Sequence, residues 1–495
     1  MRSAFQHRMS SLWVFVQDIL PVLLAIVVGA ATGMLALVAS GASSKWEVAV
    51  LVILAAFVAT LLVGDIRKIV LLAFVVDMAL GLDIALQDQE WHLGGPTGYM
   101  ISLMTIALVA GYAIWIMEKR PRPRFFAGTT IPALLYLFMV VLSLLQSSNL
   151  QLSLFGVFLQ FQFLLMYFYL ANHVRTQADL RLIVLGIMAC LLFESVLMLI
   201  QYFAGVSFSV GAIASYSVDS SASAGASGPR VGGTIGSPNS AAAYLAPMLV
   251  LTFSAYLTGK LVDTRLALLA FVLGTVALIA TATRTAWGSL ILAMLILLSY
   301  VIRTEAAGKA LWLLSVGGLI VGLLFGGQIA ERIAAVATDR TRPELATMAY
   351  NIIEAFPLGI GENNYDQVMG DRYAHPNWVG HTHYPVHNKY LLVWAETGIQ
   401  GLVAFVLFLL AAMWQARHWF FRGDVDRRLG IMGAGLLSAL AGYAFHMATE
   451  GFSSRANVQI LWFVVAILVA VTQLLMGAGP AGEGQESPGD GGVGS

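Results

Sequence analysis

Four of the nine histidines lie in one polar interval, residues 342–398, of a chain that is otherwise mostly apolar. His381, His383 and His387 are separated by one and three residues, and His375 precedes them. Neutral imidazoles at short spacing can bind zinc. A single histidine can instead act as a general base, because an ordinary pKa of about 6.5 suits proton transfer near neutral pH. Few acids and no cysteine lie nearby, which favours the general base over zinc.

A short helix is predicted over 343–356, on the N-terminal side of these histidines. Pro343 suits the first helical position, where its missing N–H costs nothing. Pro357 ends the pattern. Apolar residues fall on one face at helical spacing, namely Leu345, Met348, Ile352, Ile353 and Phe356. Arg342 stands at the start of this helix, where it is either a solvated charge or a ligand for an anion.

Two further features flank the histidines. Gly359 and Gly361 form a turn after Pro357, which either serves the chain alone or brings backbone N–H groups close to an anion. The pair His387-Asn388 directly precedes a helix, so a base there is held by the scaffold. Glu396, near the end of that helix, can orient His387 or form a hydrogen bond at the helix end.

The composition of the chain is that of a membrane protein. Of 495 residues, 59% are hydrophobic and 11% charged, whereas soluble domains carry about 45–50% apolar and about 25% charged residues. The formal net charge is zero, so nothing indicates a nucleic-acid partner. Cys190, the single cysteine, can form no intrachain disulfide and is interpreted as a core residue.

A helix needs about 20 apolar residues to cross a bilayer. Fourteen segments meet this need approximately, at 20–39, 47–63, 69–86, 98–117, 129–146, 152–171, 182–206, 239–258, 265–282, 285–302, 309–326, 388–416, 430–449 and 457–476. Gly398 and Gly401 are expected to split the long segment 388–416 into a surface half and a spanning half.

Basic residues predict the orientation, because Lys and Arg concentrate in cytoplasmic loops. With both termini in the cytoplasm, eighteen of the 27 Lys and Arg residues lie in inside loops, and the segment 327–387 is extracytoplasmic.

The predicted fold is an all-α, polytopic transmembrane helical bundle of about 12–14 spans with one large extracytoplasmic loop containing short helices. We divide the chain into an N-terminal transmembrane bundle (1–206), a flexible external loop (207–238), a catalytic membrane region (239–476) with the external loop 327–387, and a disordered tail (477–495).

Across 230–416 the motifs resemble the bacterial O-antigen ligase and O-antigen polymerase family of polytopic membrane glycosyltransferases. That family has an Arg at the start of a periplasmic helix, then a Pro-Leu-x-Gly-x-Gly turn, then a His-Asn pair that opens a helix ending Glu-x-Gly. The matching positions are Arg342, Pro357 to Gly361, His387-Asn388 and Glu396 to Gly398. Upstream elements of the family correspond to the segment from Gly233 to Asn239 and to Thr283-Arg284, followed by Trp287.

The resemblance implies transfer of a glycan from an undecaprenyl-diphosphate donor to an acceptor hydroxyl, on the outer side of the bacterial inner membrane. The acceptor would be a glycan, a lipid or a protein. His387 would be the general base, and Arg284 and Arg342 would bind the diphosphate in place of a metal. The family requires no metal or other cofactor. Asn388, Glu396, Asn239, His383, Gly359 and Gly361 would contact substrate.

Two other functions fit the same pattern. A multi-pass transporter or flippase of lipid-linked glycan or another solute shares the helix count and the acids within spans, Asp77, Asp83 and Glu194. These acids mark either a functional path or structural pairs. A non-catalytic scaffold of a polysaccharide assembly complex is the third possibility.

Overall fold

The computed structural model describes residues 65–81, 83–89, 92, 94–205, 230–334, 340–373, 375, 385–422 and 425–477. The predicted spans at 20–39 and 47–63, most of the loop 207–238, the tail beyond 477, and both His381 and His383 lie outside these residues.

The described residues form a helical bundle with one small strand pair, in this order: α3 (Ile66–Leu80), β1 (Asp83–Leu86), β2 (Tyr99–Ser102), α4 (Leu103–Glu118), α5 (Ala127–Leu142), η1 (Ser143–Gln146), α6 (Leu150–His173), α7 (Gln177–Ala204), α8 (Pro238–Thr258), α9 (Thr264–Ala280), α10 (Arg284–Val301), α11 (Ala307–Ala334), α12 (Thr341–Ala355), α13 (Tyr365–Tyr373), α14 (Lys389–Gln415), α15 (Arg417–Phe420), α16 (Arg427–Met447) and α17 (Arg455–Gly477). Within this part of the chain, nine helices are long and apolar enough to cross a membrane. The prediction of a polytopic all-α bundle is confirmed.

Two predicted spans have different boundaries. The apolar segments 69–86 and 98–117 were expected to be helical throughout, but β1 and β2 take up part of each and pair antiparallel, with Asp83 opposite Ser102. Gly81 ends α3 in a left-handed conformation, with φ of 56°, and Ser102 caps α4. Short apolar runs suit strands as well as helices, so hydrophobicity alone did not separate the two.

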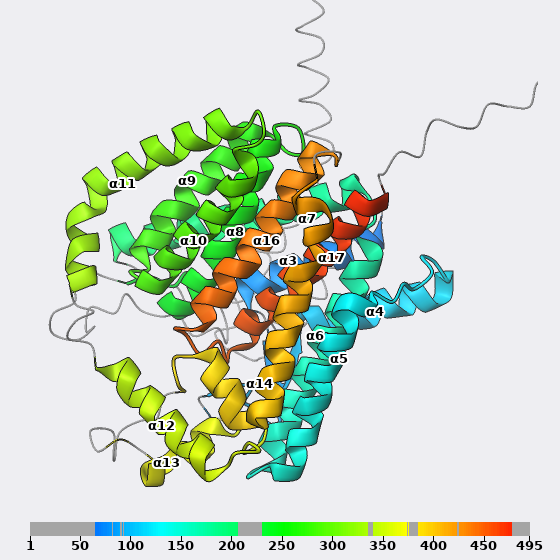
Figure 1. The fold of residues 1–495 in the computed structure, drawn as a ribbon, viewed down its shortest axis with the longest axis vertical. Helices are drawn as coiled ribbons and strands as arrows, with labels where there is room; N and C mark the ends of the chain where they lie inside the picture. The colour runs from blue at the N-terminus through cyan, green and yellow to red at the C-terminus, as the bar shows by residue number, and fades with distance from the viewer. Residues whose placement is uncertain are drawn as a thin grey trace, which may run out of the picture.

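α8 is the central helix of the bundle. It packs on α9, α10 and α16, and 89% of its most apolar window is buried, against 11% for α11. Figure 1 shows α11 curving along the edge of the bundle, away from the other helices. A helix that is apolar all round and buried all round belongs in the core, and one that is apolar but exposed in a bundle of this kind faces lipid.

A second, smaller core lies at one end of the bundle. The predicted amphipathic helix is present as α12, which buries Leu345, Met348, Ile352 and Ile353 against α13 and the start of α14. Phe356, expected on the same face, follows the last helical residue and is 38% exposed. Figure 1 places α12 and α13 below the bundle, at the end where α14 begins.

The glycine turn at Gly359 and Gly361 fixes this small core to α14 by hydrogen bonds. Ile360 N donates to Ala395 O at 3.1 Å, and Gly361 N donates to Glu396 O at 2.9 Å. These carbonyls are accessible because Gly398 breaks the helix with φ of 73° and ψ of 178°. The predicted break in the segment 388–416 is therefore confirmed at Gly398.

Replacing Gly359 by Ala tests this contact. Gly359 has φ of +96°, and an added Cβ would lie 2.5 Å from Glu396 O. We expect the substitution to lower the free energy of unfolding by more than about 1 kcal/mol, because both the backbone conformation and the space exclude a side chain. The measurement is the thermal unfolding midpoint of the detergent-solubilised protein.

The matched control is Gly322→Ala in α11, where an added Cβ meets nothing within 4 Å. Alanine in an open helical position should leave the midpoint unchanged or raise it. Equal shifts in the two variants would contradict the packing role of the turn.

Candidate active site

A buried carboxylate organises the polar end of the bundle. Glu450 lies between α16 and α17 and is 4% exposed. Its Oε1 accepts a hydrogen bond from Arg342 Nη2 at 2.9 Å, and its Oε2 lies 3.0 Å from His387 Nδ1. Two residues identified from sequence are thus joined by a third that sequence reasoning missed.

A second polar group adjoins this carboxylate. Asn239, in the first turn of α8, donates from Nδ2 to Glu450 Oε2 at 3.4 Å. Its Oδ1 accepts from Arg230 Nη2 at 2.7 Å and from Thr283 Oγ1 at 3.3 Å. The Arg230 guanidinium also donates from Nε to Thr281 O at 3.0 Å. Asn239 therefore bridges Glu450 to the turn that precedes α10.

Arg284 is the first residue of α10 and directly follows Thr283. Its side chain is half-buried. Because Thr283 contacts Asn239, and Asn239 contacts Glu450, Arg284 lies at the same end of the bundle as His387.

Helix caps hold His387 in place. Asn388 is the N-cap of α14, and its Oδ1 accepts from Tyr390 N at 2.9 Å and from Leu391 N at 3.1 Å. A capping side chain satisfies amide groups that the first turn leaves unpaired. Lys389, the next residue, is 6% exposed. The backbone on the C-terminal side of His387 is therefore fixed by the helix rather than by a free loop.

Glu194 positions the other half of the site. It accepts from Thr234 N at 3.0 Å and also from the hydroxyl of Thr234. Gln201 exchanges two hydrogen bonds with the backbone of Gly233, at 2.9 and 3.3 Å. Glu194 and Gln201 both belong to α7, so this helix holds the turn that leads into Asn239. Of the two interpretations of Glu194, the structural pair fits this geometry.

Asp77 and Asp83 also form a structural pair, with Arg455 at the start of α17. Arg455 donates from Nη1 to Asp77 at 2.5 Å and from Nε to Asp83 at 2.7 Å, and its side chain is 4% exposed. Buried charges require such partners. This contact fixes the start of α17 against α3 and β1, and so one end of the loop that carries Glu450.

Glu396 does not orient His387. Its Oε1 accepts from Tyr365 N, the first residue of α13, at 3.2 Å. Of the two roles predicted for Glu396, the hydrogen bond at a helix end matches the structure, although the helix is α13 rather than α14. The carboxylate that His387 contacts is Glu450, because the chain folds back from a point 63 residues away.

The glycine turn has its amide groups engaged. Gly359 N donates to Phe356 O at 2.9 Å, and the next two amides donate to α14, as described above. Both glycines are buried. Of the two interpretations of this turn, the one in which it serves the chain alone fits the geometry.

Glu450 is ionised at neutral pH. Burial by itself raises the pKa of this carboxyl group, but the hydrogen bond and charge of His387 and the charges of Arg342 and His446 outweigh it, so the pKa lies below the ordinary 4.5. A buried carboxylate is stable here because donors face both of its oxygens, Arg342 on Oε1 and His387 and Asn239 on Oε2.

Sequence reasoning missed Glu450 and Arg230, although weak signals for both residues were present. Between Leu429 and Ser454, Glu450 is the single residue among Asp, Glu, Lys and Arg, and it falls in the short connection between two apolar spans. Arg230 is likewise alone in a stretch of small and apolar residues. A lone charge at a span end is a functional candidate.

Metal ligands do not gather in the part of the site that the structure describes. Among those residues, no group of three or more His, Cys, Asp or Glu side chains could hold an ion. His375 is described and half-buried. The zinc hypothesis also involved His381 and His383, which lie outside the described residues.

A bundle of long apolar helices with a polar cluster at one end defines a multi-pass membrane protein. Residues 269–406 match the family described as O-antigen ligase. The resemblance inferred from the motifs is thereby confirmed for these residues, which are similar to an O-antigen ligase domain. This domain supports a membrane glycosyltransferase of the O-antigen ligase or polymerase type. A comparison with curated proteins finds no match.

The matched region includes Arg284, Arg342 and His387 but not Asn239 or Glu450. The site therefore combines residues inside the domain with residues on α8 and on the loop after α16.

The charge of Glu450 predicts a pH dependence of stability. Its pKa is lower in the folded protein than in the unfolded chain, so its stabilising effect is complete above the unfolded value of about 4.3 and is lost as pH falls through the lower folded value. We expect Glu450→Gln to lower the unfolding midpoint at pH 7. We expect the difference from wild type to shrink below about pH 4.3.

Glu305→Gln is the control, since Glu305 is 88% exposed in its pair with Arg427. An exposed pair contributes about 0–1 kcal/mol, so this variant should follow wild type at each pH. A difference between Glu450→Gln and wild type that stays constant down to pH 3 would contradict the assignment.

Proposed function

We propose that this protein transfers a glycan from an undecaprenyl-diphosphate donor to an acceptor hydroxyl at the external face of the bacterial inner membrane. Both termini would be cytoplasmic and the segment 327–387 external. The O-antigen ligase domain supports the reaction class. The observation that carries the proposal is the contact of His387 and Arg342 with the two oxygens of Glu450.

His387 is the proposed general base. An ionised Glu450 accepts a hydrogen bond from Nδ1–H, which leaves Nε2 of the neutral ring as the basic nitrogen. A histidine held in one tautomer by a buried carboxylate is a recurring arrangement for removing a proton from a hydroxyl group. His387 has 31% of its side chain exposed, so an acceptor can approach it while Glu450 stays shielded from water.

Arg342 is proposed to bind the diphosphate. One N–H group donates to Glu450, and 37% of the side chain is exposed. A guanidinium has five donors in a planar fork, so those on its exposed edge can bind phosphate oxygens. Arg284 would supply the second positive charge from the start of α10. Fixed cations of this kind stabilise a leaving diphosphate in the role that a metal plays elsewhere.

The reaction is a single displacement. The acceptor oxygen forms a bond to the anomeric carbon while the bond from that carbon to the diphosphate breaks. His387 Nε2 takes the proton of the acceptor hydroxyl, and undecaprenyl diphosphate leaves with the electron pair. Attack from the side opposite the leaving group inverts the anomeric configuration.

Asn239 and Asn388 have supporting roles in this proposal. Asn239 contacts Glu450 and Arg230, so it orients the carboxylate rather than the sugar. Asn388 fixes the helix start beside His387. His383, predicted to contact substrate, stays a candidate for the acceptor side.

Substitution of the proposed base is the principal test. In cells that make lipid-linked repeats and lack the wild-type gene, His387→Ala should lower the rate of glycan transfer by about 10²–10⁴-fold. Glu450→Gln should cause a comparable loss, because a Gln amide can donate to Nδ1 and favour the wrong tautomer. The measurement is acceptor-linked glycan per unit of membrane-inserted protein.

His375→Ala is the matched control, because His375 belongs to the same external segment and is not among the groups that lower the pKa of Glu450. It should keep nearly full transfer. Loss in His375→Ala together with wild-type transfer in His387→Ala would overturn the assignment of the base.

Substitution of the two arginines tests the proposed contact with the diphosphate. Arg342→Ala and Arg284→Ala should each lower transfer strongly, and Arg342→Lys should restore it only in part, because an ammonium group lacks the planar fork. Purified protein should keep its activity in a chelator if the arginines carry this role. Chelator-induced loss that zinc reverses would assign the histidines to a metal instead.

The same variants separate the rival functions. A transporter or flippase would keep moving lipid-linked glycan in His387→Ala. A flipping assay would then show the wild-type rate, and the amount of glycan joined to the acceptor would not change. A scaffold would show normal product in both arginine variants and loss of complex formation.

A further inference from the structure

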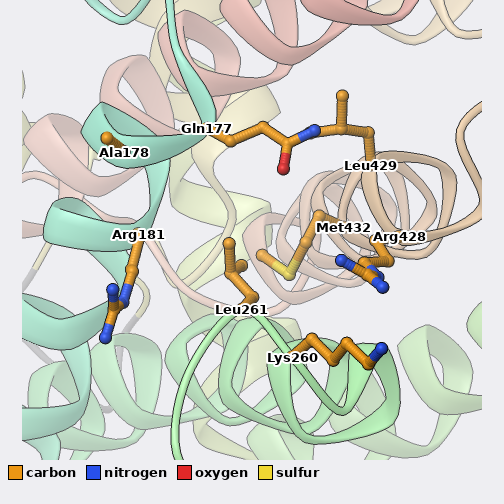
Figure 2. A pocket seen from close by; sticks show the side chains of 8 residues that line it. All are labelled: Gln177, Ala178, Arg181, Lys260, Leu261, Arg428, Leu429 and Met432. Carbon is orange, nitrogen blue, oxygen red and sulfur yellow. The ribbon is translucent and has the colours of Figure 1, made fainter. Parts of the chain in front are cut away.

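A basic pocket lies at the end of the bundle opposite Glu450. It is formed by the start of α7, the turn between α8 and α9, and the start of α16, and its volume is about 250 Å³. Its lining consists of Gln177, Ala178, Arg181, Lys260, Leu261, Arg428, Leu429 and Met432. Figure 2 shows Arg181 on one side of Leu261 and Met432, with Arg428 and Lys260 on the other.

The pocket is one membrane span away from the proposed active site. α8 carries Asn239 near its first residue and reaches the pocket after its last, 21 residues later. At about 1.5 Å per residue this is about 30 Å, the thickness of a bilayer core. α16 runs the other way, from Arg428 at the pocket toward Glu450.

Three cations line the pocket and no carboxylate does. The acids that lie nearest in sequence are engaged as helix caps. Asp179 accepts from the backbone of Arg175 and Thr176, Asp263 from Arg265 N and Leu266 N, and Asp426 from Arg428 N and Leu429 N. Arg181 Nε is buried and, within the described part of the chain, has no hydrogen-bond partner. An unneutralised basic pocket favours an anion.

Two helix starts add to this preference. α7 begins at Gln177 and α16 at Arg427, and both N-termini lie at the pocket. The N-terminal end of a helix carries partial positive charge, which stabilises a nearby phosphate. Leu261, Leu429 and Met432 supply an apolar surface between the charges.

We infer that this pocket binds the phosphate of an anionic phospholipid from the leaflet opposite the active site. Arg181, Lys260 and Arg428 contact the phosphate, and the apolar side chains contact the lipid where it enters the bilayer. A basic pocket between spanning helices on the side rich in Lys and Arg is suited to such a headgroup. The inference does not depend on the transfer reaction.

The lipid would join three helices that position the active site. α7 holds Glu194 and the turn at Thr234, α8 carries Asn239, and α16 leads to Glu450. A ligand that binds only the assembled pocket stabilises the folded protein by mass action. We therefore expect an anionic lipid to raise the unfolding midpoint.

The test uses delipidated full-length protein in a neutral detergent at low salt. Phosphatidylglycerol should remain bound in native mass spectrometry and raise the unfolding midpoint, whereas phosphatidylcholine should do neither. The double variant Lys260→Gln/Arg428→Gln should weaken phosphatidylglycerol binding by about 25-fold, since each basic residue near an anionic lipid contributes about fivefold. Both side chains are exposed, so the variant should fold.

Arg265→Gln is the matched control, because Arg265 is an exposed cation at the same end and outside the pocket lining. It should bind phosphatidylglycerol as wild type does. Arg181→Lys should keep more binding than Arg181→Gln.

Equal weakening in the control and the double variant would overturn the pocket assignment and indicate a general surface charge effect. If glycerol phosphate competes at concentrations equal to those of the lipid, the pocket binds a soluble phosphate and its assignment to a lipid is overturned. Binding that is unchanged in the double variant would also overturn the inference. Loss of glycan transfer in the His387 variant has no bearing on any of these outcomes.

Discussion

The ionised carboxylate of Glu450 is the group on which the polar end of the helical bundle depends. A charge buried to this degree is unfavourable by several kcal/mol unless donors face it. Arg342 and His387 are those donors, and each takes a separate oxygen. The carboxylate therefore forces α12, the start of α14 and the loop after α16 into one arrangement, and that arrangement is also the proposed catalytic geometry.

Rigid supports surround this contact. The second core under α12 and the glycine turn fix α12 and α13 to α14, and the break at Gly398 exposes the carbonyls that the turn needs. Arg455 anchors the far side of the Glu450 loop through Asp77 and Asp83. Acids that looked functional by their place in spans therefore serve to hold the residues that carry the proposed chemistry.

The two ends of the bundle have different electrostatic character. At the end that holds Glu450, the buried Glu450 and Arg455 each face groups of opposite charge. Two other buried acids there, Glu194 and Glu396, accept hydrogen bonds from Thr234 and from the backbone of Tyr365. The pocket at the other end gathers Arg181, Lys260 and Arg428 without a carboxylate in its lining. Uncompensated basic residues concentrate on the cytoplasmic side of membrane proteins, which is the side proposed for this pocket.

The amino-acid sequence by itself determined the class of fold, the amphipathic helix at α12, the break at Gly398 and the family. These depend on composition, on helical periodicity and on motifs whose spacing is local. The tertiary structure decided which acid faces His387. Glu396 lies nine residues along the same segment, while Glu450 lies 63 residues away. Glu450 reaches the ring only because α14 and α16 run antiparallel and bring the start of α14 near the end of α16. Spacing along a chain reports neighbours within one helix, and the partner of a buried charge is chosen by packing between helices.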